Sequence, residues 1–142
     1  MLKDRVFGVI FGQLIGDALG TRYEFSSKES AEKQVRADMS NGRLDILGGG
    51  PFALDAGQVT DDSELAFGLL HSILHNKGYD YNDVAIKYIK WYKSKPFDIG
   101  RTIRLALDGA KSYADVCINS SHHNKESLSN GCLMRISPLA VL

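Results

Sequence analysis

A hydroxyl and two adjacent carboxylates stand together at Thr60, Asp61 and Asp62, directly before an apolar helical pattern. Oxygen donors of this kind are the ligands that hard divalent cations such as Mg²⁺ prefer. Neighbouring carboxylates held on one side repel each other, and a divalent cation between them removes that repulsion. The same residues also suit ordinary helix capping, because Thr is a good N-cap and the helix dipole stabilises carboxylates in the first turn. This segment alone therefore leaves metal binding and capping both open.

Three other segments carry polar groups that could act together with it. They are residues 16–20 (Gly-Asp-Ala-Leu-Gly) with Glu24, residues 91–100 with Asp98, and residues 129–131 (Ser-Asn-Gly). Each also has a plain structural interpretation. Residues 16–20 suit a helix end, Asp98 suits the N-cap of a new helix, and residues 129–131 suit a turn. Small residues and free backbone N–H groups at a helix start can also hold a diphosphate, so residues 129–131 remain open between a turn and a phosphate site. His71 and His75 lie one helical turn apart but lack a third ligand, which favours surface histidines over a zinc site.

Helices are expected to position these groups. The periodicity of apolar residues predicts helices over residues 3–20, about 28–36, 61–76, about 82–95 and 98–113, and a further apolar segment over 132–142. Thr60 is the expected N-cap of the third helix, and Gly78 its stop. The run from Val6 to Ile15 is interpreted as a buried helix, with glycines four residues apart allowing another helix or a ligand to approach closely. Since no segment alternates convincingly as a strand, we expect an all-α fold.

The composition limits the classes of function. A chain of 142 residues with 44% hydrophobic residues has the size of one domain, here residues 1–142. Its 17 basic and 17 acidic residues give no net field that favours nucleic acid or an anionic membrane. The run from Val6 to Ile15 is shorter than the ~20 apolar residues of a membrane span. Cys117 and Cys132 lack the spacing of a zinc or redox motif, so we expect reduced thiols and a cytoplasmic protein.

Taken in order along the chain, these segments resemble the ADP-ribosylglycohydrolase family, which includes the dinitrogenase-reductase-activating glycohydrolases. The resemblance runs from about Val6 to Leu142 and rests on residues 16–25, 57–66, 91–100 and 129–135. It implies a compact orthogonal helical bundle, two Mg²⁺ ions, and hydrolysis of the bond that joins ADP-ribose to a protein side chain or a small acceptor.

The same resemblance implies roles for individual residues. Thr60, Asp61 and Asp62 correspond to metal ligands. Glu24 corresponds to the acidic residue near the scissile ribose, and Asp98 to a residue on the acceptor side. The loop that holds the diphosphate and distal ribose corresponds to residues Ser127, Ser129, Asn130 and Gly131.

One feature of the family is missing. Members carry further metal ligands in a C-terminal Asp-x-Asp-Ser/Thr motif, and no Asp-x-Asp occurs in this sequence. We therefore expect the chain to correspond to about the N-terminal half of a typical member, and the second Mg²⁺ site to be incomplete. Activity would then be weak, or it would depend on a second chain that completes the metal site. The alternatives are a catalytically inactive homologue that binds ADP-ribose and a fragment that serves assembly.

Overall fold

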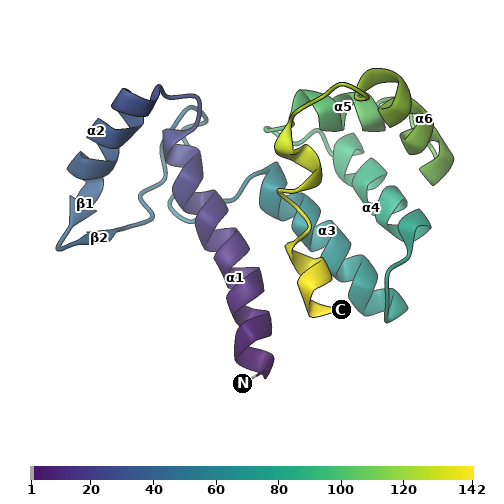
Figure 1. Ribbon diagram of the computed structural model, residues 1–142, viewed down its shortest axis with the longest axis horizontal. Coiled ribbons are helices and arrows are strands. Elements are labelled where there is room, and N and C mark those ends of the chain that lie inside the picture. Colours follow the sequence, from purple (N-terminus) through teal and green to yellow (C-terminus); the bar gives the residue numbers. More distant parts are fainter. Residues whose placement is uncertain (1) are drawn as a thin grey trace.

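The computed structural model describes residues 2–142, and nearly all of its regular elements are helices (Figure 1). The long helix α1 (Leu2–Gly20) separates a small lobe from a larger helical lobe. The elements are η1 (Thr21–Tyr23), α2 (Lys28–Asp38), β1 (Met39–Ser40), β2 (Arg43–Leu44), α3 (Asp61–Asn76), α4 (Tyr81–Lys93), α5 (Arg101–Leu107), α6 (Tyr113–His123), η2 (Asn130–Cys132) and η3 (Ser137–Val141). The expected all-α class is confirmed. Sequence reasoning missed one short antiparallel hairpin, in which Met39 pairs with Leu44.

The main core lies in the larger lobe, where α3, α4 and α5 pack together. The buried apolar side chains that form it are Leu65, Leu69, Ile73, Val84, Tyr88, Ile89, Ile103, Leu107 and Ala110. On α3 and α4 these residues follow the spacing of three or four that places side chains on one face of a helix. The start of α3 is therefore fixed from behind by packing.

The interpretation of the N-terminal helix as buried was wrong. In this chain α1 contacts η3, η1 and α3 along one side only, and its opposite side remains exposed. Phe7, Phe11 and Ile15 are each more than half exposed, and among residues 3–20 only Ala18 is buried. A Cβ added at Gly8 or Gly12 would meet nothing within 4 Å, so the expected close approach at the glycines is not found among residues 2–142. No helix in that range is both long enough and apolar enough to cross a membrane.

Two helix boundaries differ from the prediction in the same part of the chain. Residues 98–113 do not form one helix, because α5 begins only after its N-cap Gly100 and ends at Leu107. A new helix, α6, then begins at a capping box formed by Ser112 and Asp115, a motif that satisfies two otherwise unpaired backbone donors. The segment that follows Gly100 is thus a pair of short helices, which leaves Asp98 in the preceding loop.

Charged hydrogen bonds hold the small lobe to the end of α1. Helix α2 has no buried residue, so apolar packing does not fix it. Arg22 instead donates to both carboxylate oxygens of Asp38, at 2.7 and 3.0 Å, and to the carbonyl of Gly48 at 2.7 Å. The hydroxyl of Tyr23 adds a third hydrogen bond to Asp38 at 3.0 Å. Because Arg22 and Tyr23 immediately precede Glu24, this cluster also orients the segment that carries the candidate acid.

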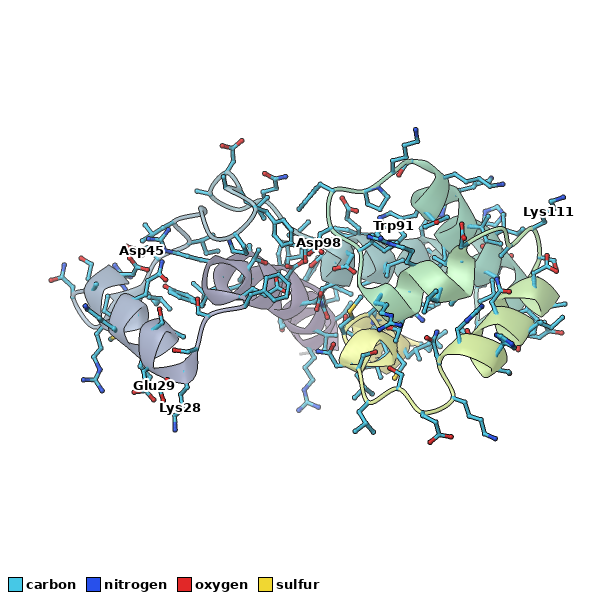
Figure 2. The ribbon with its side chains drawn as sticks, turned by 90° about the horizontal axis from the view of Figure 1, so that it is seen from above. Lys28, Glu29, Asp45, Trp91, Asp98 and Lys111 are labelled. Atoms are coloured by element: carbon cyan, nitrogen blue, oxygen red, sulfur yellow. The ribbon has the colours of Figure 1, made fainter. Side chains whose placement is uncertain are left out.

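Replacing Asp38 with asparagine is expected to destabilise the protein at neutral pH and to change how its free energy of unfolding depends on pH in the acidic range. The hydrogen bond from Arg22 lowers the pKa of Asp38 below its usual 3.8. A lowered pKa means that this stabilisation is complete above the unfolded pKa and is lost as the pH falls through the folded pKa. Urea unfolding followed by circular dichroism should show a difference between wild type and Asp38→Asn that is largest at pH 7 and shrinks toward pH 3. Asp45→Asn, which alters an exposed carboxylate of the same lobe (Figure 2), should show no such difference. A pH-independent difference for Asp38→Asn would contradict the assignment.

Candidate active site

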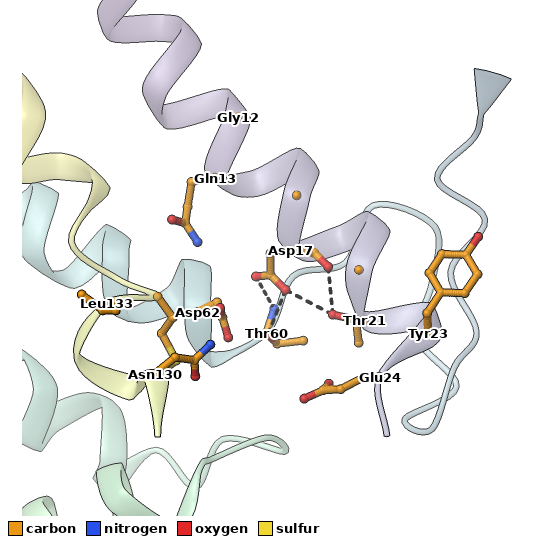
Figure 3. Close-up of a pocket in the computed structure, with 13 residues that line it drawn as sticks. Gly12, Gln13, Asp17, Thr21, Tyr23, Glu24, Thr60, Asp62, Asn130 and Leu133 are labelled. Atoms are coloured by element: carbon orange, nitrogen blue, oxygen red, sulfur yellow. Dashed lines mark hydrogen bonds between the residues drawn. The ribbon is translucent and has the colours of Figure 1, made fainter. Parts of the chain in front are cut away.

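A cavity of about 720 Å³ opens where α1, η1 and the start of α3 meet (Figure 3). Its lining includes Asp17 from α1, Glu24 after η1, Thr60 and Asp62 at the start of α3, and Asn130 of η2. These residues are far apart in the sequence, and the fold brings them to one space. The cavity therefore contains three groups that the sequence had marked separately.

Asp17 organises the floor of this cavity from a different helix. Its carboxylate accepts hydrogen bonds from the backbone N–H of Thr60 at 2.9 Å and of Ser63 at 3.1 Å. It also accepts the hydroxyl proton of Thr60 at 2.8 Å, and that of Thr21 at 3.2 Å. Thr60 is the N-cap of α3 as expected, but its side chain makes no capping bond. Asp17 supplies the capping acceptor instead, and Figure 3 shows its bonds to Thr60 and Thr21.

This arrangement leaves an oxygen of Thr60 available for another partner. The Thr60 hydroxyl gives its proton to Asp17, so the lone pairs of the same oxygen remain free to accept or to coordinate. Thr60 and Asp61 are both buried. One oxygen of Asp61 accepts the backbone N–H of Gly100 at 3.1 Å, which links α3 to the loop that carries Asp98. Hydrogen bonds to Asp17 and to Gly100 thus hold the side-chain oxygens of Thr60 and Asp61 in place at the start of α3.

A hydrogen bond from α4 also stabilises the first turn of α3. The indole N–H of Trp91 on α4 donates to the carboxylate of Glu64 at 2.5 Å. Glu64 lies in the first turn of α3 with Asp61 and Asp62. Figure 2 places Trp91 on the larger lobe and Asp98 toward the junction with α1.

Several carboxyl groups in the site hold their protons more tightly than usual. Burial, followed by the charges of Asp17, Asp61, Glu24 and Asp98, raises the pKa of Asp62 to about 7. Burial and the neighbouring charges of Asp61, Glu24 and Asp17 raise the pKa of Asp98 to about 6. Burial is also the main cause of the raised pKa of Asp61, which the N–H of Gly100 partly offsets.

Glu24 is open to solvent on one side, yet partial burial and the charges of Asp61 and Asp17 raise its pKa as well. The site therefore concentrates negative charge.

The oxygen atoms of the site are of the type that Mg²⁺ prefers, but the side chains supply too few of them to complete its coordination. Carboxylate and hydroxyl oxygens are hard ligands, and a divalent cation would offset the repulsion that raises these pKa values. Within residues 2–142, however, no three His, Cys, Asp or Glu side chains gather closely enough to hold a cation by themselves. Mg²⁺ takes six oxygens, so Thr60, Asp61 and Asp62 would need further ligands from water, substrate or another polypeptide.

The residues expected to hold a diphosphate divide between two places. Asn130 lines the main cavity. Ser127, Ser129 and Gly131 line a neighbouring pocket of about 210 Å³ next to α5. There the Ser129 hydroxyl lies 2.8 Å from that of Thr102, and Gly131 packs so closely that an added Cβ would lie 3.2 Å from Ile103 and Thr102. Their assignment to substrate stays a prediction.

Sequence reasoning missed several residues of the cavity. Asp17 lies in residues 16–20, which the sequence marked as a segment that could act with Thr60, but no role was predicted for its side chain and a helix end was the plain alternative. Gln13, Leu133 and Met134 also line the cavity, and no role was predicted for any of them. Gly100 contributes through its backbone alone, which no side-chain pattern can reveal.

Comparison with known proteins connects this site to a family. The sequence profile described as ADP-ribosylglycohydrolase matches residues 1–142. The chain is 41% identical over 139 residues to L543 of Acanthamoeba polyphaga mimivirus, a protein named provisionally as an ADP-ribosyl glycohydrolase. That match covers 96% of this chain and 41% of the viral protein. The chain is also 31% identical over 146 residues to the ADP-ribosylarginine hydrolase Tri1 of Pseudomonas putida (strain GB-1), with 97% of this chain and 36% of Tri1 covered.

A solved structure shares the fold. The match to a chain of an ADP-ribosylglycohydrolase-related protein complex has a TM-score of 0.72 and 32% sequence identity, and it covers 98% of this chain and 42% of the other. The chain thus spans about two fifths of the length of the proteins that it matches.

Proposed function

Because the chain belongs to the ADP-ribosylglycohydrolase family, we propose that it contributes the metal-binding and acidic part of a hydrolase that releases ADP-ribose from a protein side chain or a small acceptor. The observation that carries this proposal is the cavity shared by Glu24, Thr60 and Asp62. The named activity of the Pseudomonas putida relative, hydrolysis of ADP-ribosylarginine, supports the same reaction class.

We assign Thr60, Asp61 and Asp62 as ligands of Mg²⁺, with a second ion whose site needs additional donors. A bound Mg²⁺ would hold ribose hydroxyls and a water and would stabilise developing negative charge. Asp17 accepts the hydroxyl proton of Thr60 and thereby leaves the lone pairs of the Thr60 oxygen free for the ion. Asn130 lies across the same cavity, where its amide can bind the polar part of a nucleotide sugar.

The acidic side chains have separate tasks in this proposal. Cleavage at the anomeric carbon of ribose passes through an oxocarbenium-like state, which a nearby carboxylate stabilises. Glu24 is assigned this role because it borders the cavity without a hydrogen bond to the Asp17 cluster. Asp98 is placed on the acceptor side, and its pKa of about 6 suits proton exchange with a leaving group near neutral pH.

Two features bear on partners of the protein. Phe7, Phe11 and Ile15 follow one another at a spacing of four on α1 and are all exposed, and adjoining exposed apolar side chains are typical of an interaction surface. We propose that a second polypeptide covers this face and adds oxygen ligands to the site. We also propose a cytoplasmic location, where the free cysteines Cys117 and Cys132 would stay reduced.

The proposed reaction is tested with ADP-ribosylated arginine and serine peptides in the presence of Mg²⁺, with and without candidate partner chains. Release of ADP-ribose is expected, and Glu24→Gln should abolish the release while calorimetry still detects ADP-ribose binding. Binding of ADP-ribose without turnover under any condition would favour the non-catalytic alternative. If the protein forms oligomers whose stability does not change when Mg²⁺ is added, and if it does not bind ADP-ribose, a role in assembly would be favoured instead.

A further inference from the structure

Two buried serine hydroxyls on different elements share an unusual property. The side-chain oxygens of Ser63 on α3 and Ser137 on η3 are both inaccessible to solvent, and neither has a hydrogen-bond partner in the part of the chain that the structure describes. Burying a hydroxyl without a partner is costly, and the large majority of buried polar side-chain atoms are paired with protein or with ordered water. Each of these hydroxyls therefore needs a partner that the side chains around it do not supply.

Both serines line the same small pocket between α1, α3 and η3. Its volume is about 10 Å³. The other side chains that line it are Ile10, Gln13, Leu14, Ala66, Phe67, Leu70 and Pro138. Gln13 also lines the main cavity (Figure 3), so the small pocket adjoins the candidate active site. One shared space is thus available to the two hydroxyls.

The size and the chemistry of this pocket determine what it can hold. One water molecule needs roughly 10–15 Å³, so the pocket has room for a single water and for nothing larger. Its lining contains no charged side chain, and neutral hydroxyls do not offset the cost of burying an ion. A purely apolar cavity would stay dry, but a buried water makes two to four hydrogen bonds, and two hydroxyls supply the minimum.

We propose that this pocket is a binding site for one ordered water molecule, which forms a hydrogen bond with each of the two serine hydroxyls and so joins η3 to α3. Ser63 directly follows Asp62, and its backbone N–H donates to Asp17 at 3.1 Å. The water therefore connects the acidic first turn of α3 to the segment that follows Asn130. This role belongs to the fold itself and does not depend on the proposed hydrolase.

Serine-to-alanine substitutions test the water through the sign of their effect on stability. If one water bonds to both hydroxyls, Ser63→Ala and Ser137→Ala should each raise the unfolding equilibrium constant about fivefold, as expected for one lost hydrogen bond. The double variant should lose little more than either single variant, because both substitutions break the same bridge. Urea unfolding followed by circular dichroism measures all three.

Two outcomes of this cycle would contradict the proposal. If the hydroxyls have no partner at all, each alanine should make the protein more stable, because it removes an unsatisfied buried group. If the losses of Ser63→Ala and Ser137→Ala are additive, each hydroxyl has a separate partner and no shared water exists.

Ser72→Ala provides a matched control on the same helix. Ser72 is as fully buried as Ser63, but its hydroxyl accepts the side-chain amide of Asn76 at 3.4 Å. The effect of Ser72→Ala should therefore add to that of Ser137→Ala. A non-additive result for this control pair would mean that the coupling is not specific to the pocket, and it would overturn the inference.

Oxygen-17 relaxation dispersion of the solvent detects long-lived buried water directly. Wild type and Ser72→Ala should each show one more long-lived water than the variant that carries both Ser63→Ala and Ser137→Ala. Equal signals in all three proteins would refute the water site, whatever their stabilities. The measurement involves neither ADP-ribose nor Mg²⁺, so its result stands whether or not the protein hydrolyses ADP-ribosylated substrates.

Discussion

Replacing Asp17 with alanine is expected to lower the free energy of unfolding by about 2–3 kcal/mol, the sum for a lost helix cap and lost hydrogen bonds to a charged group. The change leaves the backbone N–H groups of Thr60 and Ser63 without their acceptor. Ser63 is fully buried, so water cannot readily replace the carboxylate. Urea unfolding followed by circular dichroism at pH 7 measures the loss.

Asn at the same position is the informative comparison. Asp17→Asn keeps one oxygen acceptor and the shape of the side chain, so it should lose clearly less stability than Asp17→Ala. Asp45→Ala, in an exposed part of the small lobe, should stay within about 0.5 kcal/mol of wild type. If Asp17→Ala also stays within that range, Asp17 does not cap α3 in solution.

The same residue should influence metal affinity through Thr60. Because Thr60 donates its proton to Asp17, loss of that bond frees the hydroxyl to rotate. Calorimetry with Mg²⁺ should show weaker binding for Asp17→Asn than for wild type, but little further loss when Asp17→Asn is added to Thr60→Val. Additive losses in this double-mutant cycle would mean that Asp17 acts independently of Thr60.

Asp62→Asn is expected to abolish the stabilisation of the protein by Mg²⁺. A ligand at 100 times its dissociation constant stabilises the folded state by about 2.7 kcal/mol, and Asp62 is one of the three proposed side-chain ligands. Thermal unfolding with and without saturating Mg²⁺ should show a rise in Tm for wild type and none for Asp62→Asn. Asp45→Asn should retain the full rise. An equal rise in Tm for Asp62→Asn would mean that Asp62 is not a ligand of Mg²⁺.

Without metal the same substitution should have the opposite effect on stability. The pKa of Asp62 is raised from 3.8 to about 7, so the folded state retains this proton between those values while the unfolded state loses it. The stability of the wild type therefore falls as the pH rises through that window. In EDTA at pH 8, Asp62→Asn should be more stable than wild type by about 1–2 kcal/mol, a figure reduced for solvent screening. At pH 4 the difference should disappear.

The sequence carried enough information to predict the central helices. Leu65, Leu69, Val84 and Ile89 are buried as their helical spacing indicated. Periodicity succeeds here because α3 and α4 each present one apolar face to a shared core. It failed for α1, whose apolar residues occur all round the helix and so do not distinguish a buried face from an exposed one. The capping box at Ser112 and Asp115 stands in the sequence as Ser-x-x-Asp, but the prediction of one helix over residues 98–113 rested on apolar periodicity and did not use it.

The candidate site was predictable only where it is local. Thr60, Asp61 and Asp62 are consecutive, so the sequence offered a cation site there beside ordinary helix capping, and the resemblance to the family favoured the cation site. The contact between Asp17 and Thr60 joins residues 43 positions apart, and no local pattern encodes such a distance. The raised pKa values likewise arise from charges that only the folded chain brings together.

The hydrogen bond between Trp91 and Glu64 provides a natural optical probe of this region. Trp91 is the single tryptophan of the chain, and its indole is tied directly to the turn that carries Asp61 and Asp62. Excitation at the red edge of protein absorbance therefore isolates emission from one known place. Any event that shifts that turn, including cation uptake, is reported by native fluorescence without a label.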